Sequence, residues 1–236
     1  MTVLYLIRHG QASFGAEDYD RLSERGRRQA ALLGEHLSRT RPPFDAVYTG
    51  RMRRQSDTAS AAGLGGEGEA ETLAALDEYD HMSVIRAYLP LFLEKEGGRK
   101  GLGPEDLVAD HDAFEAAFRF MVRAWMDDTP HQQPGMETWQ QFCDRVAGGL
   151  DAMVRQSRPG SRIAAVTSGG VVAAALRQVL GLSNSRTLSV NWSIYNASVT
   201  QLSYGRGGNR GEAMVLGFNN IAHLELAGDD DLITFR

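Results

Sequence analysis

Three short segments of the sequence combine groups that could bind a phosphate and attack it. The triplet Arg8-His9-Gly10 and the side chain of Arg54 each follow an apolar run, and Ser168-Gly169-Gly170 follows a third. A glycine pair at a helix start can turn backbone N–H groups toward an anion, and two arginines can hold a tetrahedral phosphate. A neutral imidazole nitrogen among these cations would be placed to attack phosphorus. The pattern is compatible with nucleophilic phosphoryl transfer at His9, and a buried histidine that is only hydrogen-bonded is the common alternative.

The elements that position these groups alternate along the chain. Ligands of open α/β sheets bind outside the carboxyl ends of the strands, which is where the three segments fall. The pattern predicts a three-layer α/β/α sandwich with a mostly parallel central sheet and a helical insertion. We expect one domain over residues 1–236, with the insertion, or cap, at about 83–135. Predicted strands are Met1–Ile7, Phe44–Thr49, Arg162–Thr167, Ala197–Tyr204 and Ala213–Phe218, the last two joined by a loop at 205–211. One predicted helix follows Ser23. The other predicted helices span Met52–Ala62, Val84–Glu96, Pro104–Asp128, Glu137–Gln156 and Val171–Leu180.

Composition narrows the classes of partner. The chain has 236 residues, of which 42% are hydrophobic, and its formal net charge is -5. Its 25 Lys and Arg residues are scattered, so we expect no nucleic acid partner. The longest apolar stretches fall short of the ~20 residues that a membrane span needs, so we expect no membrane partner. A single cysteine, Cys143, cannot form an internal disulfide, which favours a cytoplasmic location. The oligomeric state stays open, with a homodimer as one alternative.

Five segments in order resemble one known family. They are Arg8-His9-Gly10, the stretch 20–30, the stretch 48–54, Leu76-Asp77-Glu78, and the stretch 135–146. The sequence is similar in these segments to the histidine phosphatase (phosphoglycerate mutase-like) superfamily, and the resemblance covers essentially the whole chain.

The resemblance implies hydrolysis of a small phosphomonoester through a phosphohistidine. His9 would attack in line, and Glu78 in its acid form would protonate the departing oxygen. Arg8 and Arg54 would hold the equatorial oxygens, together with Ser168 and Gly169. Water would then release the phosphate, with no metal and no cofactor.

The sequence departs from the family pattern at Ser168, where a second histidine is usual. A serine can donate one neutral hydrogen bond but no charge, a loss of roughly 1.5 to 3 kcal/mol in stabilisation of the transition state. The chain could therefore be a slow enzyme, an enzyme that recruits another histidine, or a phosphoester-binding protein without turnover. A phosphoglycerate mutase-like phosphotransferase is the remaining alternative.

Several further residues are candidates for a contact with substrate or a supporting role. His81 could enter the mouth of the pocket, and His223 is a second substitute histidine with a structural role as its alternative. Gln11 and Ser13 could face substrate, and Glu137 could lie near the site or cap a helix. For the remaining histidines, His36, His111 and His131, we expect no chemical role.

Overall fold

The fold is built on one mixed six-stranded sheet. The computed structural model describes residues 1–13, 20–65, 70–97, 103–128, 133–205 and 213–235. Within these residues the strand order is β3-β2-β4-β1-β5-β6. The first four strands in that order pair in parallel, whereas β5 is antiparallel to both of its neighbours. The strands are β1 (Thr2–Arg8), β2 (Ala46–Thr49), β3 (Glu71–Thr72), β4 (Arg162–Thr167), β5 (Val199–Tyr204) and β6 (Met214–Asn220).

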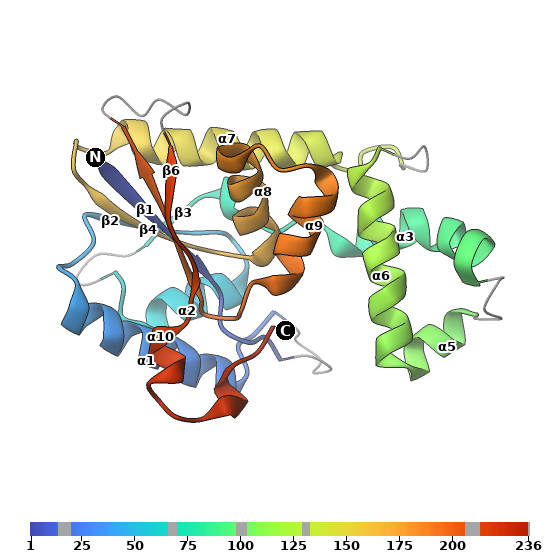
Figure 1. The fold of residues 1–236 in the computed structure, drawn as a ribbon, viewed down its shortest axis with the longest axis horizontal. Coiled ribbons are helices and arrows are strands. Elements are labelled where there is room, and N and C mark those ends of the chain that lie inside the picture. Colours follow the sequence, from blue (N-terminus) through green and yellow to red (C-terminus); the bar gives the residue numbers. More distant parts are fainter. Residues whose placement is uncertain (14–19, 66–69, 98–102, 129–132, 206–212, 236) are drawn as a thin grey trace.

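Helices cover both faces of this sheet, as Figure 1 shows. One face carries α1 (Glu24–Thr40) and α2 (Arg53–Ala61), and the other carries α7 (Trp139–Gln156) and α8 (Gly169–Leu180). The predicted three-layer α/β/α class is confirmed. None of the helices described is both long enough and apolar enough to cross a bilayer.

Strand β1 explains why two helical layers are needed. Leu4 and Leu6 point into the larger apolar cluster, which includes residues of α7 and α8. Tyr5 and Ile7 point the other way, into a cluster that includes Leu33 of α1. Successive side chains of a strand face opposite sides, so a strand that is apolar at every position must be covered on both. This apolar run ends at Arg8, which is charged.

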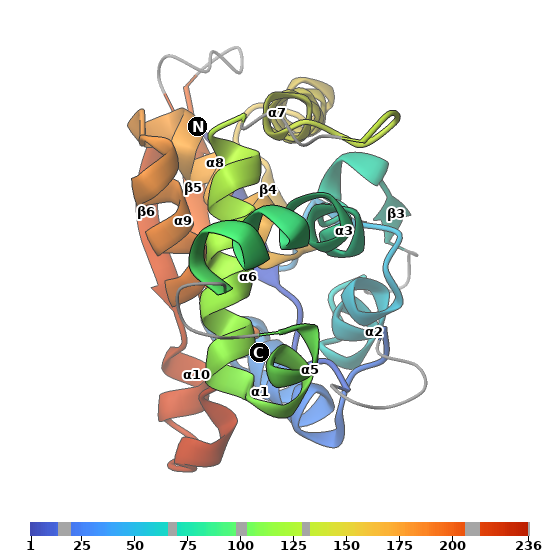
Figure 2. The ribbon, with the colours of Figure 1, turned by 90° about the vertical axis from the view of Figure 1, so that its right-hand side faces the viewer.

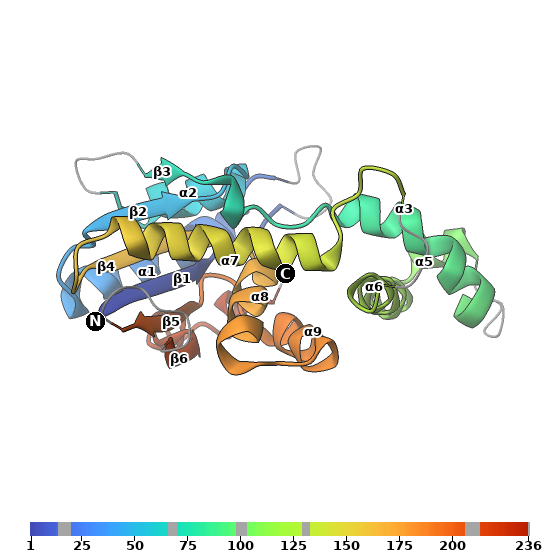
Figure 3. The same ribbon diagram turned by 90° about the horizontal axis from the view of Figure 1, so that it is seen from above.

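A group of helices extends beyond the sheet, at the right of Figures 1 and 3 and in front in Figure 2. It contains α3 (His81–Phe92), the π-turn η2 (Leu93–Gly97), α5 (Pro104–Ala109) and α6 (His111–Met126). The expected single helix over Pro104–Asp128 is wrong. Asp110 ends α5 and caps α6, because its carboxylate accepts hydrogen bonds from the backbone N–H groups of Asp112 and Ala113.

Other boundaries also differ from the expectation because of side-chain caps. Helix α3 starts three residues before the predicted Val84, since Asp80 caps it, and α7 starts after the cap Thr138. Several short or polar elements were not predicted: β3, α9 (Asn184–Ser193), α10 (Ala222–Glu225) and the 3₁₀ turns η1 (Ala74–Leu76) and η4 (Asp230–Leu232). Most of the predicted loop at 205–211 lies outside the described residues, and His131 lies outside them too.

A short 3₁₀ turn, η1 (Ala74–Leu76), rests directly on α7 and leads into Glu78. A Cβ placed on Gly149 of α7 would lie 2.2 Å from the Ala75 Cβ, whereas a Cβ on the neighbouring Gly148 would meet nothing within 4 Å. The two adjacent glycines therefore differ in what they contact, and only Gly149 is required by the packing.

We expect Gly149→Ala to lower the free energy of unfolding by about 1–3 kcal/mol, since η1 must move to admit the methyl group. Gly148→Ala is the matched control and should raise it by about 0.5–1 kcal/mol, because alanine is favoured inside a helix. Denaturant unfolding of both variants measures the difference. Equal effects of the two substitutions would contradict this packing.

Candidate active site

His9 lies directly after β1, and its backbone is held on both sides. Its N–H donates to the Thr167 carbonyl at 2.8 Å, and its carbonyl accepts from the Ala197 N–H at 3.2 Å and the Asn196 amide at 3.3 Å. The ring Nδ1 lies 2.7 Å from the Gly10 carbonyl oxygen. Because a carbonyl can only accept, Nδ1 must carry the hydrogen in this contact. The lone pair is then on Nε2.

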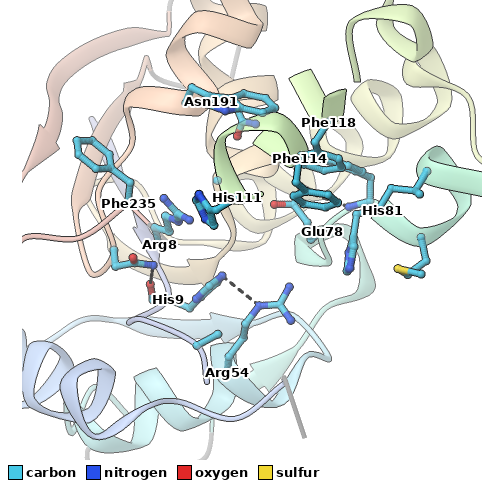
Figure 4. Close-up of a pocket in the computed structure, with 17 residues that line it drawn as sticks. Arg8, His9, Arg54, Glu78, His81, His111, Phe114, Phe118, Asn191 and Phe235 are labelled. Atoms are coloured by element: carbon cyan, nitrogen blue, oxygen red, sulfur yellow. Dashed lines mark hydrogen bonds between the residues drawn. The ribbon is translucent and has the colours of Figure 1, made fainter. Parts of the chain in front are cut away.

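Arg54 approaches that lone pair. Its Nε lies 3.1 Å from His9 Nε2, as the dashed line in Figure 4 shows, and only 6% of the residue is exposed. Its Nη1 forms an ion pair of 2.6 Å with Asp20 Oδ1. The other oxygen of Asp20 accepts from the Arg53 N–H at the start of α2. Asp20 therefore orients Arg54, a role that was not predicted although Asp20 begins one of the five family-like segments.

Arg8 supplies the second cation. Its side chain donates to the Ile194 carbonyl, and it lies beside Gly169 at the start of α8. Burial, Arg54 and Arg8, in that order, hold the pKa of His9 well below its usual range, and the hydrogen bond to Gly10 opposes them. His9 is consequently neutral at pH 7, the form in which Nε2 can act as a nucleophile.

Glu78 stands across the cavity from these groups (Figure 4). Its carboxylate accepts from the Gly170 N–H at 2.9 Å and from the Tyr79 N–H at 3.2 Å. A Cβ on Gly170 would lie 2.1 Å from Glu78 Oε1, so only glycine permits this approach. One backbone donor of the predicted glycine pair is thus already used by Glu78.

The segment that carries Glu78 is fixed at each residue before it. The Leu76 carbonyl accepts from the Thr167 hydroxyl at 2.6 Å and from the Gln55 amide at 3.0 Å. Asp77 pairs with Arg51 at 2.6 Å. Burial raises the pKa of Glu78, and the N–H groups of Gly170 and Tyr79 with the two arginines oppose the rise. A raised pKa keeps a carboxylic acid protonated to higher pH, as a general acid needs.

These groups share one cavity of about 690 Å³. Its polar part contains Arg8, His9, Arg54, Glu78, His81 and His111. Aromatic rings from separate elements make up much of the rest, together with Met82, Ile85 and the amides of Asn191 and Asn196. Figure 4 labels three of the rings, Phe114, Phe118 and Phe235. Sequence reasoning missed this aromatic lining, because no local spacing links the insertion to the end of the chain.

Two further histidines, His111 and His81, line the cavity. His111, the first residue of α6, lines the cavity, and the expectation that it has no chemical role stays a prediction. His81, the first residue of α3, lines it near Glu78. Burial and Arg54 lower the pKa of His81, and Asp80 opposes them. Before phosphate binds, His81 is therefore a neutral hydrogen-bonding group, and its contact with substrate stays a prediction.

Ser168 is 1% exposed and is not among the residues that line the cavity. Its hydroxyl accepts from the Gln55 amide at 2.9 Å. Gly169, the next residue, does line the cavity. A direct contact between Ser168 and phosphate stays a prediction. In this structure the Ser168 hydroxyl instead holds Gln55, whose amide also donates to the Leu76 carbonyl ahead of Glu78.

The remaining candidates lie off the cavity wall. Gln11 accepts from the Ser23 hydroxyl, and Ser13 forms a backbone hydrogen bond to Arg21. Glu137 forms a bidentate ion pair with Arg145 at 2.7 and 2.9 Å, and Arg145 in turn donates to the carbonyls of Ala74 and Asp77. Glu137 therefore supports the Glu78 segment through a second residue.

His223 lies in α10 next to α1, and its ring centroid is 6.1 Å from that of His36. Burial first, and His36 second, lower the pKa of His223 to about 4. It does not line the cavity. As for metals, the described part of the chain holds no group of three or more His, Cys, Asp or Glu side chains that could bind an ion.

The family comparison agrees with this geometry. Residues 4–85 and 109–216 match the histidine phosphatase superfamily (branch 1). The chain belongs to this superfamily. A search of curated proteins finds no match.

Solved structures show that the fold is shared. Phosphoserine phosphatase from Entamoeba histolytica in complex with phosphoserine has a TM-score of 0.65 at 18% identity, covering 95% of this chain and 100% of that one. Phosphoglycerate mutase from Bacillus anthracis has a TM-score of 0.63 at 20% identity, covering 97% of each chain. A mycobacterial glucosyl-3-phosphoglycerate phosphatase has 0.62 at 21%, covering 92% of this chain and 98% of that one. These likenesses show that the fold of the chain is shared with these three proteins.

The state of the His9 ring is directly measurable. At pH 7 we expect ¹⁵N spectra to show a neutral ring with its hydrogen on Nδ1, and still a neutral ring at about pH 6, below the ordinary pKa of histidine. His9→Ala identifies the signals by removing them. Finding a doubly protonated ring at pH 7 would contradict the geometry.

Proposed function

We propose that this protein is a phosphomonoester phosphatase that acts on a small phosphorylated metabolite through a phosphohistidine at His9. The observation that carries the proposal is the His9 Nε2 lone pair beside buried Arg54, with Glu78 across the same cavity. We place the reaction in the cytoplasm, because the lone Cys143 gives no support for an oxidising compartment.

The proposed reaction has two steps. In the first, a bond forms between His9 Nε2 and phosphorus while the ester P–O bond breaks, and the proton of Glu78 passes to the leaving oxygen. In the second, the Glu78 carboxylate accepts a proton from water, whose oxygen attacks phosphorus and displaces His9. Arg8 and Arg54 offset the charge on the phosphoryl oxygens in both steps.

Hydrolysis is preferred to mutase activity because of the number of cations. A phosphoglycerate mutase-like enzyme must hold a substrate that carries a second anionic group, and it must return the phosphoryl group to that substrate. Among the described residues that line the cavity, the arginines are Arg8 and Arg54, and both lie beside His9. They can serve one phosphate, which supports transfer to water.

Phosphate trapping tests the nucleophile. We expect rapid acid-free quenching of the wild type with a ³²P-labelled monoester to leave acid-labile, alkali-stable phosphate on His9. His9→Ala should lose both this label and turnover, because it removes the imidazole whose Nε2 lies 3.1 Å from Arg54 Nε. His36→Gln, a histidine of α1 outside the cavity, is the matched control and should keep both. Full activity of His9→Ala would refute the mechanism.

One observation favours a second candidate, a phosphoester-binding protein without turnover. Ser168 replaces the charge of the usual second histidine with a neutral hydroxyl that lies behind the wall and is bonded to Gln55. Calorimetry would then show binding of inorganic phosphate while no monoester is hydrolysed. The labelling experiment separates the two candidates, since a binding protein forms no phosphohistidine.

Glu78→Gln tests the general acid. We expect a loss of about 100- to 10,000-fold in turnover of an alkyl phosphate, and a much smaller loss for 4-nitrophenyl phosphate, whose leaving group needs no proton. The wild-type rate for the alkyl ester should fall as pH rises, because Glu78 loses its proton, at a pH above the ordinary range for glutamate. The variant should lack that limb. Equal losses for both esters would exclude Glu78 as the proton donor.

A further inference from the structure

The part of the cavity farther from His9 has an aromatic wall built by α6 and α9. Phe114 and Phe118 are one turn apart on α6, and their rings are stacked at 6.0 Å with an interplanar angle of 4°. Phe118 also lies 6.0 Å from Trp192 of α9. All three side chains are only partly buried and line the cavity. They therefore present apolar surface to whatever occupies it.

The end of the chain adds a fourth ring. Phe235 is 44% exposed, lines the cavity, and stacks on Tyr195 with a centroid distance of 4.3 Å. The preceding Thr234 is tied down, since its hydroxyl accepts from Gln29 at 2.9 Å and donates to Asn196 at 2.9 Å. Asn196 also bonds the His9 carbonyl. The position of Phe235 is thus fixed relative to the nucleophile.

Charge is distributed unevenly over the same cavity. In the described part of the wall, the side chains that can carry a full charge at neutral pH by residue type are Arg8, Arg54 and Glu78, and all three lie near His9. No Lys or Arg is among the described residues that line the aromatic part. Arg119 lies near it, with its guanidinium 5.2 Å from the centroid of the Trp192 ring, but that guanidinium is paired with Glu115 at 3.0 Å. A carboxylate or second phosphate placed there would lose its hydration without gaining a cation, which is costly. An apolar group would instead bury its surface against the rings.

We propose that the substrate is a phosphomonoester of an apolar alcohol, preferably an aromatic one, with no second anionic group. This inference rests on the proposed phosphatase function. The cavity, at about 690 Å³, is in the range of about 300–1,000 Å³ that holds a drug-sized ligand. It is larger than the phosphate of a three-carbon acid requires. Phosphoglycerate and phosphoserine, which both carry a carboxylate, are therefore poor matches.

Substrates with similar leaving groups test the proposal without a bias from intrinsic reactivity. The apolar pair is 2-phenylethyl phosphate and 2-(2-naphthyl)ethyl phosphate, and the polar pair is glycerol 3-phosphate and O-phosphoserine. We expect kcat/KM of the wild type to be at least about tenfold higher for the apolar pair, equivalent to ~1.4 kcal/mol. A preference for glycerol 3-phosphate or O-phosphoserine would overturn the proposal.

Variants of α6 locate the effect. Phe118→Ala should lower kcat/KM about tenfold for the naphthyl ester and leave glycerol 3-phosphate nearly unchanged. Phe120→Ala is the matched control, since Phe120 lies on the same helix but packs on Phe92 at 5.5 Å and does not line the cavity. Phe118→Arg should shift the preference toward O-phosphoserine. Equal losses for all substrates in Phe118→Ala would also overturn the proposal.

Binding separates failure of this inference from failure of the proposed function. Calorimetry on His9→Ala should give the same ranking, with 2-phenylethyl phosphate bound more tightly than O-phosphoserine. That ranking without turnover by the wild type would reject the phosphatase and retain the ligand class. Turnover and labelling of His9 without the ranking would retain the phosphatase and reject the ligand class.

Discussion

Two guanidinium groups packed against a neutral imidazole set the main constraint on this structure. A buried cation needs polar partners, and each arginine has them: Arg8 has the Ile194 carbonyl, and Arg54 has Asp20 and His9. The same charges act with burial to oppose protonation of His9, and they act against burial at Glu78, whose ionisation they favour. A phosphate dianion that enters the cavity offsets both cations. The proposed nucleophile is therefore kept neutral by charges that a bound phosphate would offset.

Backbone contacts, more than side-chain charge, hold this arrangement. The His9 backbone is hydrogen-bonded to β4 on one side and to residues 196–197 on the other. The Glu78 carboxylate accepts a hydrogen bond from the Gly170 N–H. Each contact depends on a strand end or helix start that cannot move without disturbing the sheet. The charged groups are consequently positioned by elements whose own stability comes from the apolar clusters on both faces. Catalytic geometry and core packing are coupled in this fold.

Much of the polar half of the site could be predicted from sequence, and little of the apolar half. The segments around Arg8, Arg54 and Gly169 follow strands whose apolar patterns are local, so their meeting at one sheet edge follows from the α/β class. Asp20 and the cap Asp110 were missed, because one side chain decides each of those contacts. Phe118, Trp192 and Phe235 are far apart in sequence. Only tertiary packing brings these three residues together, and no periodicity in the sequence indicates that they are close.

The aromatic wall also bears on the charge that Ser168 does not supply. Interactions between the arginines and the phosphoryl oxygens strengthen as water leaves the cavity, since the local dielectric falls. An apolar leaving group seated on Phe114 and Phe118 would displace that water, whereas a small hydrophilic ester would leave the cavity wet. The same contact would then improve the chemical step as well as binding. Because Ser168 supplies no charge, the stabilisation of the transition state in this site would gain most from a substrate that excludes water.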